Sequence, residues 1–154
     1  MRLVVLVGLP GSGKSTYLER LGVTGLSSDA MRKLLADDET VQSIHPQVFE
    51  TLRYLLRQRM MLQRDVTYID ATNLTPGERH PYIAIGRAYG CEIEAVFFDV
   101  PFEVCLERNR SRGRSVPEEA LRTMSAKLCI PSADEGFHRI IRMGMNWEPM
   151  APFS

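Results

Sequence analysis

Apolar and polar residues follow two different spacings along the chain, and together they predict a sheet of buried strands connected by helices. A continuous apolar run at residues 3–7 and largely apolar segments at residues 66–69 and 93–98 are typical of strands that are buried on both faces. Shorter strand candidates lie at residues 25–27 and 138–143. Because helical patterns separate these segments, we expect right-handed crossovers over a parallel sheet. The pattern predicts a single α/β domain.

The segments between the strands carry apolar residues at helical spacing, with capping signals at their ends. Helices are expected at residues 14–21, 30–36, 47–64, 76–89, 101–109 and 118–128. Asp29 and Asp99 stand before the second and fifth of these helices, where a carboxylate commonly acts as a cap. Thr75 and Ser115 each begin a capping box with a glutamate three positions later. These signals predict where the helices start.

Length and charge fit one globular domain that covers residues 1–154. The chain carries 19 basic and 19 acidic side chains. Proteins that wrap duplex DNA usually have an excess of basic residues, so this class is not favoured. An enzyme that binds only the end of a strand is compatible with the balanced charge.

Cysteine usage and the N-terminal residues bear on the cellular compartment. Cys91, Cys105 and Cys129 are odd in number and form no C-x-x-C pair, so we expect reduced cysteines, without a zinc site or a disulfide framework. The apolar run at residues 3–7 is too short for a signal-peptide core or a membrane span. A cytoplasmic protein without a membrane partner is expected.

A glycine-rich segment lies between the first strand and the first helix. Its residues are Gly8, Leu9, Pro10, Gly11, Ser12, Gly13, Lys14 and Ser15, with the G-x-x-x-x-G-K-S spacing of a P-loop. The glycines let successive backbone N–H groups form an anion site at a helix N-terminus. Lys14 is placed for the β- and γ-phosphates, Ser15 for Mg²⁺ and Thr16 for the α-phosphate. The segment predicts ATP and Mg²⁺, although kinases, GTPases and ATP-driven regulators all share it.

Phosphoryl transfer to a hydroxyl also needs a carboxylate near the acceptor. Asp29 and Arg32 lie one helical turn apart, so Asp29 can accept the hydroxyl proton while Arg32 binds an anionic group of the acceptor. A helix cap and a solvated charge fit the same two positions equally well. Asp70 ends a buried strand, where P-loop proteins commonly hold an acid near Mg²⁺, here through water. Thr72 and Asn73 are placed to hydrogen-bond a substrate.

An arginine-rich segment connects two of the predicted helices. Four arginines and a glycine fall within residues 108–114. Such runs are often solvated surfaces, but the position between two helices favours a lid that closes arginines over ATP. We place this lid at about residues 110–117.

These features together resemble the kinase domain of polynucleotide 5′-hydroxyl kinases, of both the phage end-healing and the mammalian DNA-repair type. Residues 8–16 are similar to the family's phosphate cradle, 28–32 to its acid-plus-arginine motif, and 70–74 to its Asp/Thr/Asn motif. Residues 98–113 resemble the strand, helix and lid of the phage enzyme, and 131–137 the segment that closes the mammalian domain. The resemblance implies a P-loop kinase fold with a five-stranded parallel sheet of order 2-3-1-4-5.

The resemblance also implies roles for individual residues. Lys14 would bind the phosphates, and Asp29 would act as the general base. Arg32 would engage the 3′-phosphate of the terminal nucleotide. Arg108 and Arg112 would be the lid arginines that neutralise charge on ATP, which makes Arg112 a catalytic candidate beside the first three.

The sequence departs from the family pattern in two places. In the phage enzyme the acid of the third motif lies one position closer to the Thr-Asn pair, where this chain has Ala71, whereas the mammalian pattern fits Asp70 directly. Bifunctional members also carry an aspartate-rich 3′-phosphatase motif that this sequence lacks, so 3′-phosphatase activity is not expected.

The leading hypothesis is transfer of the ATP γ-phosphate to 5′-hydroxyl ends of RNA or DNA. A small-metabolite kinase acting on a sugar, sugar acid or antibiotic is the first alternative, because the balanced charge does not demand a nucleic-acid surface. An ATP-binding module that transfers no phosphate is the second, although Asp29 and the arginine segment would be unnecessary for it.

Overall fold

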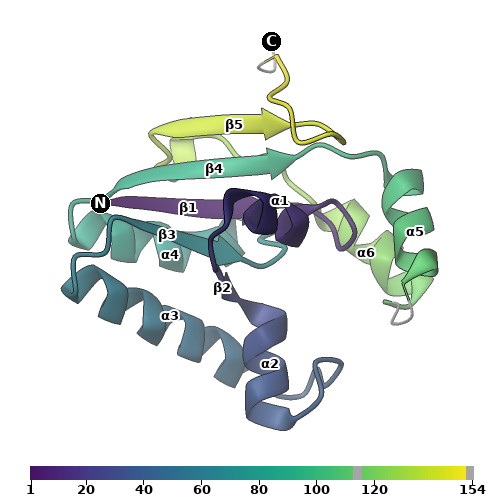
Figure 1. Ribbon diagram of the computed structural model, residues 1–154, viewed down its shortest axis with the longest axis horizontal. Helices are drawn as coiled ribbons and strands as arrows, with labels where there is room; N and C mark the ends of the chain where they lie inside the picture. Colours follow the sequence, from purple (N-terminus) through teal and green to yellow (C-terminus); the bar gives the residue numbers. More distant parts are fainter. Residues whose placement is uncertain (113–115, 152–154) are drawn as a thin grey trace.

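The computed structural model describes residues 1–112 and 116–151, which form a five-stranded sheet with helices around it (Figure 1). The strand order is β2-β3-β1-β4-β5, and neighbouring strands are parallel. The strands are β1 (Arg2–Val7), β2 (Leu26–Ser27), β3 (Val66–Asp70), β4 (Glu92–Phe98) and β5 (Arg139–Met143). The order and the parallel arrangement confirm the fold expected from the sequence.

Helices cover both faces of the sheet and extend past the carboxyl ends of its strands (Figure 1). They are α1 (Lys14–Leu21), α2 (Ser28–Ala36), α3 (His45–Met61), α4 (Pro76–Ala88), α5 (Phe102–Ser111), α6 (Glu118–Lys127) and the short 3₁₀ helix η1 (Ala133–Glu135). The third helix ends three residues earlier than the sequence pattern predicts. Among the described residues, none of the helices has the length and apolar character that crossing a membrane requires.

The central place of β1 in the sheet explains why residues 3–7 of this strand are all apolar. Leu3, Val5 and Val7 pack against α3 and α4 on one face of the sheet. Val4 and Leu6 pack on the other face, together with Leu18 and Tyr17 of α1 and Val96 of β4. A strand buried on both faces loses the alternation of apolar and polar side chains that a half-exposed strand shows.

Two of the four predicted helix caps, Asp29 and Asp99, are wrong. Asp29 lies inside its helix instead of before it, and Asp99 binds a different partner. The N-cap of α2 is Ser27, whose Oγ accepts a hydrogen bond from the backbone N–H of Ala30 at 3.1 Å, so Asp29 lies inside the first turn. Asp99 accepts a hydrogen bond from Nε of Arg142 at 2.7 Å, and α5 begins after Pro101 without a side-chain cap.

The two predicted capping boxes have different outcomes. The box at Thr75 and Glu78 is confirmed, with both of its hydrogen bonds present. The box predicted at Ser115 cannot be followed at that residue, which lies outside the described part of the chain. The helix α6 begins at Glu118, as expected, with Pro117 as its N-cap, and the Glu118 carboxylate pairs with Arg110 of α5 and Arg122 of α6.

A buried ion pair ties the chain after β3 to the C-terminal segment. Arg79 is fully buried, and its Nε and Nη2 donate to the two carboxylate oxygens of Glu135 at 2.7 and 2.9 Å. Its Nη1 donates to the backbone oxygens of Asn73 and Cys129. One guanidinium therefore joins the loop after β3, beside the phosphate-binding turn, to two points of the C-terminal segment.

Removing the Glu135 carboxylate is expected to be strongly destabilising because Arg79 would remain charged and buried. We expect Glu135→Ala to lower the free energy of unfolding by about 3–5 kcal/mol. Glu119→Ala, at an exposed acid of α6, is the matched control and should change it by less than about 0.5 kcal/mol. Urea denaturation measures both, and equal effects of the two variants would contradict the structural role of the pair.

Candidate active site

The phosphate-binding turn between β1 and α1 has a backbone that only glycine adopts readily at two positions. Gly11 and Gly13 have φ angles of 82° and 103°. A Cβ at Gly11 would also lie 2.9 Å from the backbone oxygen of Cys105, and one at Gly13 would lie 2.8 Å from Nε1 of Trp147. The turn is therefore shaped by its glycines, which leave the backbone N–H groups at the start of α1 available for an anion.

Lys14 is held inside this turn. Its Nζ donates hydrogen bonds to the backbone oxygens of Gly8 at 2.8 Å and Leu9 at 2.9 Å. Burial lowers the pKa of Lys14 to about 8, against the opposing effect of the Asp70 and Asp29 carboxylates. The ammonium group is thus pre-positioned where the predicted phosphates would bind.

Ser15 and Asp70 lie together, as the sequence predicted for a magnesium site. The Ser15 hydroxyl donates to Oδ2 of Asp70 at 3.2 Å. Burial raises the pKa of Asp70, although Lys14 and the Ser15 hydrogen bond act in the opposite direction. In the described ranges no group of three or more His, Cys, Asp or Glu side chains gathers to bind a metal. One hydroxyl and one carboxylate nevertheless fit Mg²⁺, which usually keeps several waters and binds substrate phosphates.

The acceptor candidates Asp29 and Arg32 lie together in the first turns of α2. The Arg32 side chain is only 5% exposed, and its Nη1 lies 3.4 Å from Oδ1 of Asp29, whose side chain is 58% exposed. Nη2 of Arg32 lies 3.1 Å from Nδ1 of His45, the first residue of α3. The buried Nε has no hydrogen-bond partner among the described residues. Arg32 is therefore a fixed, buried cation behind an accessible carboxylate, not a solvated charge.

His45 is a component of this arrangement that sequence reasoning missed. Burial and the charge of Arg32 lower the pKa of His45 below its usual 6.5, while Glu78 opposes the shift. Its ring also packs on Phe49, with centroids 4.6 Å apart. No motif marks this histidine, and its contact with Arg32 depends on how α2 and α3 pack.

The lowered pKa of His45 predicts a pH dependence of stability. As the pH falls below about 6.5, the unfolded chain takes up a proton at His45 before the folded chain does, so the free energy of unfolding decreases until the folded pKa is reached. His45→Gln keeps an acceptor for Arg32 but does not titrate. Urea denaturation between about pH 7.5 and about pH 5 should therefore show a smaller decrease in the free energy of unfolding for the variant than for the wild type. Identical pH profiles would contradict this account.

The arginine segment after α5 reaches the phosphate-binding turn at one point. Nη1 of Arg108 donates to the backbone oxygen of Gly11 at 3.1 Å. Arg112 is exposed, and its charge lowers the pKa of Lys14, so it lies within electrostatic reach of the turn. Arg110 instead pairs with Glu118 of α6 at 3.1 Å. Residues 113–115 of the predicted lid lie outside the described part of the chain.

Thr72 and Asn73 lie beside the phosphate-binding turn, where both form hydrogen bonds with backbone atoms. The backbone oxygen of Thr72 accepts a hydrogen bond from the N–H of Gly8 at 3.0 Å. Asn73 is buried with φ 48°, and its Nδ2 donates to the backbone oxygens of Leu6 at 2.7 Å and Ala71 at 3.3 Å. The amide of Asn73 therefore holds the loop in place. Substrate binding by the two residues stays a prediction.

Trp147, which follows β5, is a second residue of the site, after His45, that the sequence analysis missed. Its Nε1 donates to the backbone oxygen of Gly13 at 2.9 Å, and Cζ of Arg20 lies 4.3 Å from the ring centroid. As the single tryptophan of the chain it was conspicuous, but nothing in the sequence indicated its distance from the turn. The indole supports the phosphate-binding turn from the C-terminal side.

The comparison with protein families matches the architecture built up above. A family profile described as an AAA domain, AAA_33, matches residues 3–131. The chain belongs to the AAA_33 family. It is a P-loop kinase domain of that type, with the strand order and phosphate-binding turn described above.

Individual relatives differ in what they act on. The L-seryl-tRNA(Sec) kinase of Methanococcus maripaludis is 24% identical over 136 residues, which cover 84% of this chain and 53% of that protein. A chain of the Pnkp1/Rnl/Hen1 RNA repair complex has a TM-score of 0.71 at 23% identity, over 82% of this chain and 43% of its own length. A sugar kinase from a Janibacter species has a TM-score of 0.68 at 21% identity, over 95% of this chain and 86% of its own length.

These comparisons establish the fold and leave the acceptor open. The chain spans about half the length of the seryl-tRNA kinase and less than half of the matched repair chain. At such identities the likeness to the solved structures concerns the fold alone. The acceptor must therefore be inferred from the residues of this chain.

Proposed function

We propose that this protein is an ATP-dependent polynucleotide 5′-hydroxyl kinase, acting on the ends of RNA or DNA. The observation that carries the proposal is the pairing of an exposed carboxylate, Asp29, with a buried cation, Arg32, beside the phosphate-binding turn. The charge of Asp29 acts on both Lys14 and Asp70, so it lies within electrostatic reach of the turn. A module that only binds ATP has no need of a carboxylate there.

Arg32 supports an acceptor that carries negative charge near its reacting hydroxyl. Its guanidinium is buried and oriented by Asp29 and His45, yet its Nε has no partner among the described residues. A guanidinium held in this way is suited to a phosphate or a carboxylate. The terminal nucleotide of a strand with a 3′-phosphodiester provides such an anion one sugar away from the 5′-hydroxyl.

The residues of this chain would carry the reaction by positioning and by charge neutralisation. Asp29 would accept the proton of the 5′-hydroxyl as its oxygen attacks the γ-phosphorus in line with the leaving ADP. Lys14 and the backbone N–H groups of the turn would hold the phosphates, and Arg112 would offset charge on the transferred group. Mg²⁺, held by Ser15 and through water by Asp70, would neutralise charge on the phosphate oxygens.

A small-metabolite kinase is the second candidate, and one observation favours it. The fold of the Janibacter sugar kinase matches 95% of this chain, against 82% for the chain from the RNA repair complex. A sugar acid would also satisfy Arg32 through its carboxylate. The balanced charge of the chain fits such an acceptor as well.

Salt dependence distinguishes the two candidates. For a 5′-hydroxyl decanucleotide, raising the salt from about 50 mM to about 200 mM should raise KM steeply, because each phosphate contact adds about 0.7 to the logarithmic slope. The KM of a sugar acid bound at one site should change much less. Transfer to the decanucleotide with a steep slope supports the polynucleotide kinase. Transfer only to the sugar acid would replace it, and ATP hydrolysis without any labelled acceptor would overturn both.

A further inference from the structure

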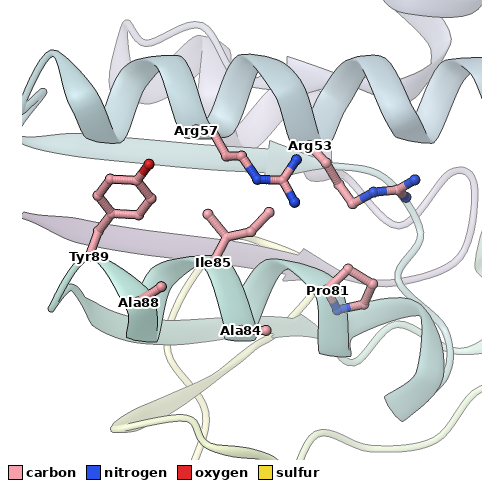
Figure 2. Close-up of a pocket in the computed structure, with 7 residues that line it drawn as sticks. All are labelled: Arg53, Arg57, Pro81, Ala84, Ile85, Ala88 and Tyr89. Atoms are coloured by element: carbon pink, nitrogen blue, oxygen red, sulfur yellow. The ribbon is translucent and has the colours of Figure 1, made fainter.

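A groove of about 420 Å³ lies between α3 and α4, outside the candidate active site (Figure 2). Figure 2 shows two arginine side chains reaching from α3 over a mostly apolar surface of α4. The lining residues are Arg53, Arg57, Pro81, Ala84, Ile85, Ala88 and Tyr89. None of them takes part in the phosphate-binding turn or the Asp29–Arg32 pair, so the groove needs an explanation of its own.

The two arginines are cations without a hydrogen-bond or ion-pair partner in the part of the chain that the structure describes. Neither Arg53 nor Arg57 has a hydrogen bond or an ion pair with any described residue, whereas Arg59, on the same helix, donates to Thr67 and Val66. They lie at i and i+4 on α3, so their Cβ atoms are about 5–6 Å apart. Two unpaired guanidinium groups over a concave surface attract a ligand with repeated negative charges.

The opposite wall offers apolar and aromatic surface. Ala84, Ile85 and Ala88 form its aliphatic part, and Tyr89, with 38% of its surface exposed, closes one end. Bases of single-stranded nucleic acid stack on such side chains while basic residues follow the backbone. An inorganic anion would use the cations and leave this wall without a role.

The groove begins at the edge of the sheet where the acceptor candidates lie. The charge of Glu78, in the first turn of α4, acts to raise the pKa of His45, which lies beside Arg32. Glu78 also acts on the pKa of Tyr82, and so does Arg53 of the groove, so these groups lie within electrostatic reach of one another. Along the axis of α3, Arg53 lies about 12 Å and Arg57 about 18 Å from His45. A strand whose end reached Asp29 would therefore meet the two arginines a few nucleotides later.

We propose that the α3–α4 groove binds the single-stranded polynucleotide that follows the reacting 5′-hydroxyl, with Arg53 and Arg57 on neighbouring phosphates and Tyr89 against a base. The inference rests on the proposed function and adds a second binding region to it. It makes the enzyme selective for strands long enough to reach the groove. Recognition would depend little on sequence, because every base offers a face for stacking.

The test compares a 5′-hydroxyl dinucleotide with a 5′-hydroxyl decanucleotide of the same 5′ sequence. In the wild type the decanucleotide should have the lower KM at a similar kcat. The double variant Arg53→Ala/Arg57→Ala should raise the decanucleotide KM about tenfold or more and reduce its logarithmic salt slope by about two. Its kcat and KM for the dinucleotide should not change, which also shows that the variant is folded.

Further variants separate the groove from general surface charge. Lys127→Ala/Arg139→Ala removes the same charge from exposed positions outside the groove and should leave the decanucleotide KM within about twofold of wild type. Tyr89→Ala should raise that KM about fivefold or more, and Tyr89→Phe should restore it. An unchanged decanucleotide KM in the Arg53/Arg57 double variant would overturn the groove proposal while the kinase assignment stands. Failure of the wild type to phosphorylate either oligonucleotide would instead overturn the proposed function.

Discussion

Asp29→Asn is expected to lower kcat about 10²–10⁴-fold, the usual contribution of a general base. The substitution removes the proton acceptor but keeps a side-chain oxygen of similar size near Arg32. ATP binding should stay close to wild type, because the contacts of Lys14 with Gly8 and Leu9 do not involve Asp29. Single-turnover kinetics measures the first effect and calorimetric titration with ATP the second.

Asp37→Asn is the matched control for this experiment. Asp37 follows α2 with φ 62°, a left-handed conformation that asparagine tolerates, and it is exposed. This variant should retain wild-type turnover. Turnover of Asp29→Asn equal to that of the control would show that the general base had been assigned to the wrong residue.

Lys14→Ala is expected to damage ATP binding and phosphoryl transfer together. The Lys14 ammonium is buried in the turn, and its predicted contacts with the β- and γ-phosphates exist in the ground state and become stronger as charge moves during transfer. We expect kcat/KM for ATP to fall at least about 10²-fold, with a measurable rise in the Kd for ATP. This combined effect distinguishes it from Asp29→Asn, which should change turnover alone.

Two controls keep the Lys14 prediction interpretable. Loss of the ammonium leaves the backbone oxygens of Gly8 and Leu9 without their donor, so thermal unfolding must first show that the variant is folded. Lys127→Ala, at an exposed lysine of α6, should behave as wild type in both assays. A folded Lys14→Ala variant with unchanged ATP affinity would contradict the role of the turn as the phosphate site.

Most of the fold was predictable because its signals are local. The apolar run of β1 has to be buried on both faces, and the capping box at Thr75 fixes the start of α4 within four residues of sequence. Of the two wrong caps, Asp29 lies two positions after the actual N-cap, Ser27, whereas Asp99 has a partner that is distant in the chain. Asp99 looks like a cap locally, but Arg142, which is 43 positions away, is folded against it. The residues around Asp99 give no indication of this ion pair.

In the candidate site, too, the residues with local sequence signals were predicted and those with long-range contacts were not. The glycine and lysine spacing of the phosphate-binding turn reflects one short backbone conformation, so residues 8–15 were visible in the sequence. The contact of Arg32 with His45 joins two helices across a loop, and that of Trp147 with Gly13 joins opposite ends of the chain. Such contacts depend on packing, and single-sequence patterns do not report them.

The most direct measurement of the central claim uses γ-labelled ATP, Mg²⁺ and three decanucleotides of one sequence, ending in a 5′-hydroxyl, a 5′-phosphate or a 5′-deoxy group. A panel of sugars and sugar acids is assayed in parallel. We predict label on the 5′-hydroxyl strand alone, recovered as 5′-phosphate after digestion to mononucleotides, and its loss in Asp29→Asn. Label on a sugar or sugar acid with none on the 5′-hydroxyl strand would contradict the assignment of this protein as a polynucleotide 5′-kinase.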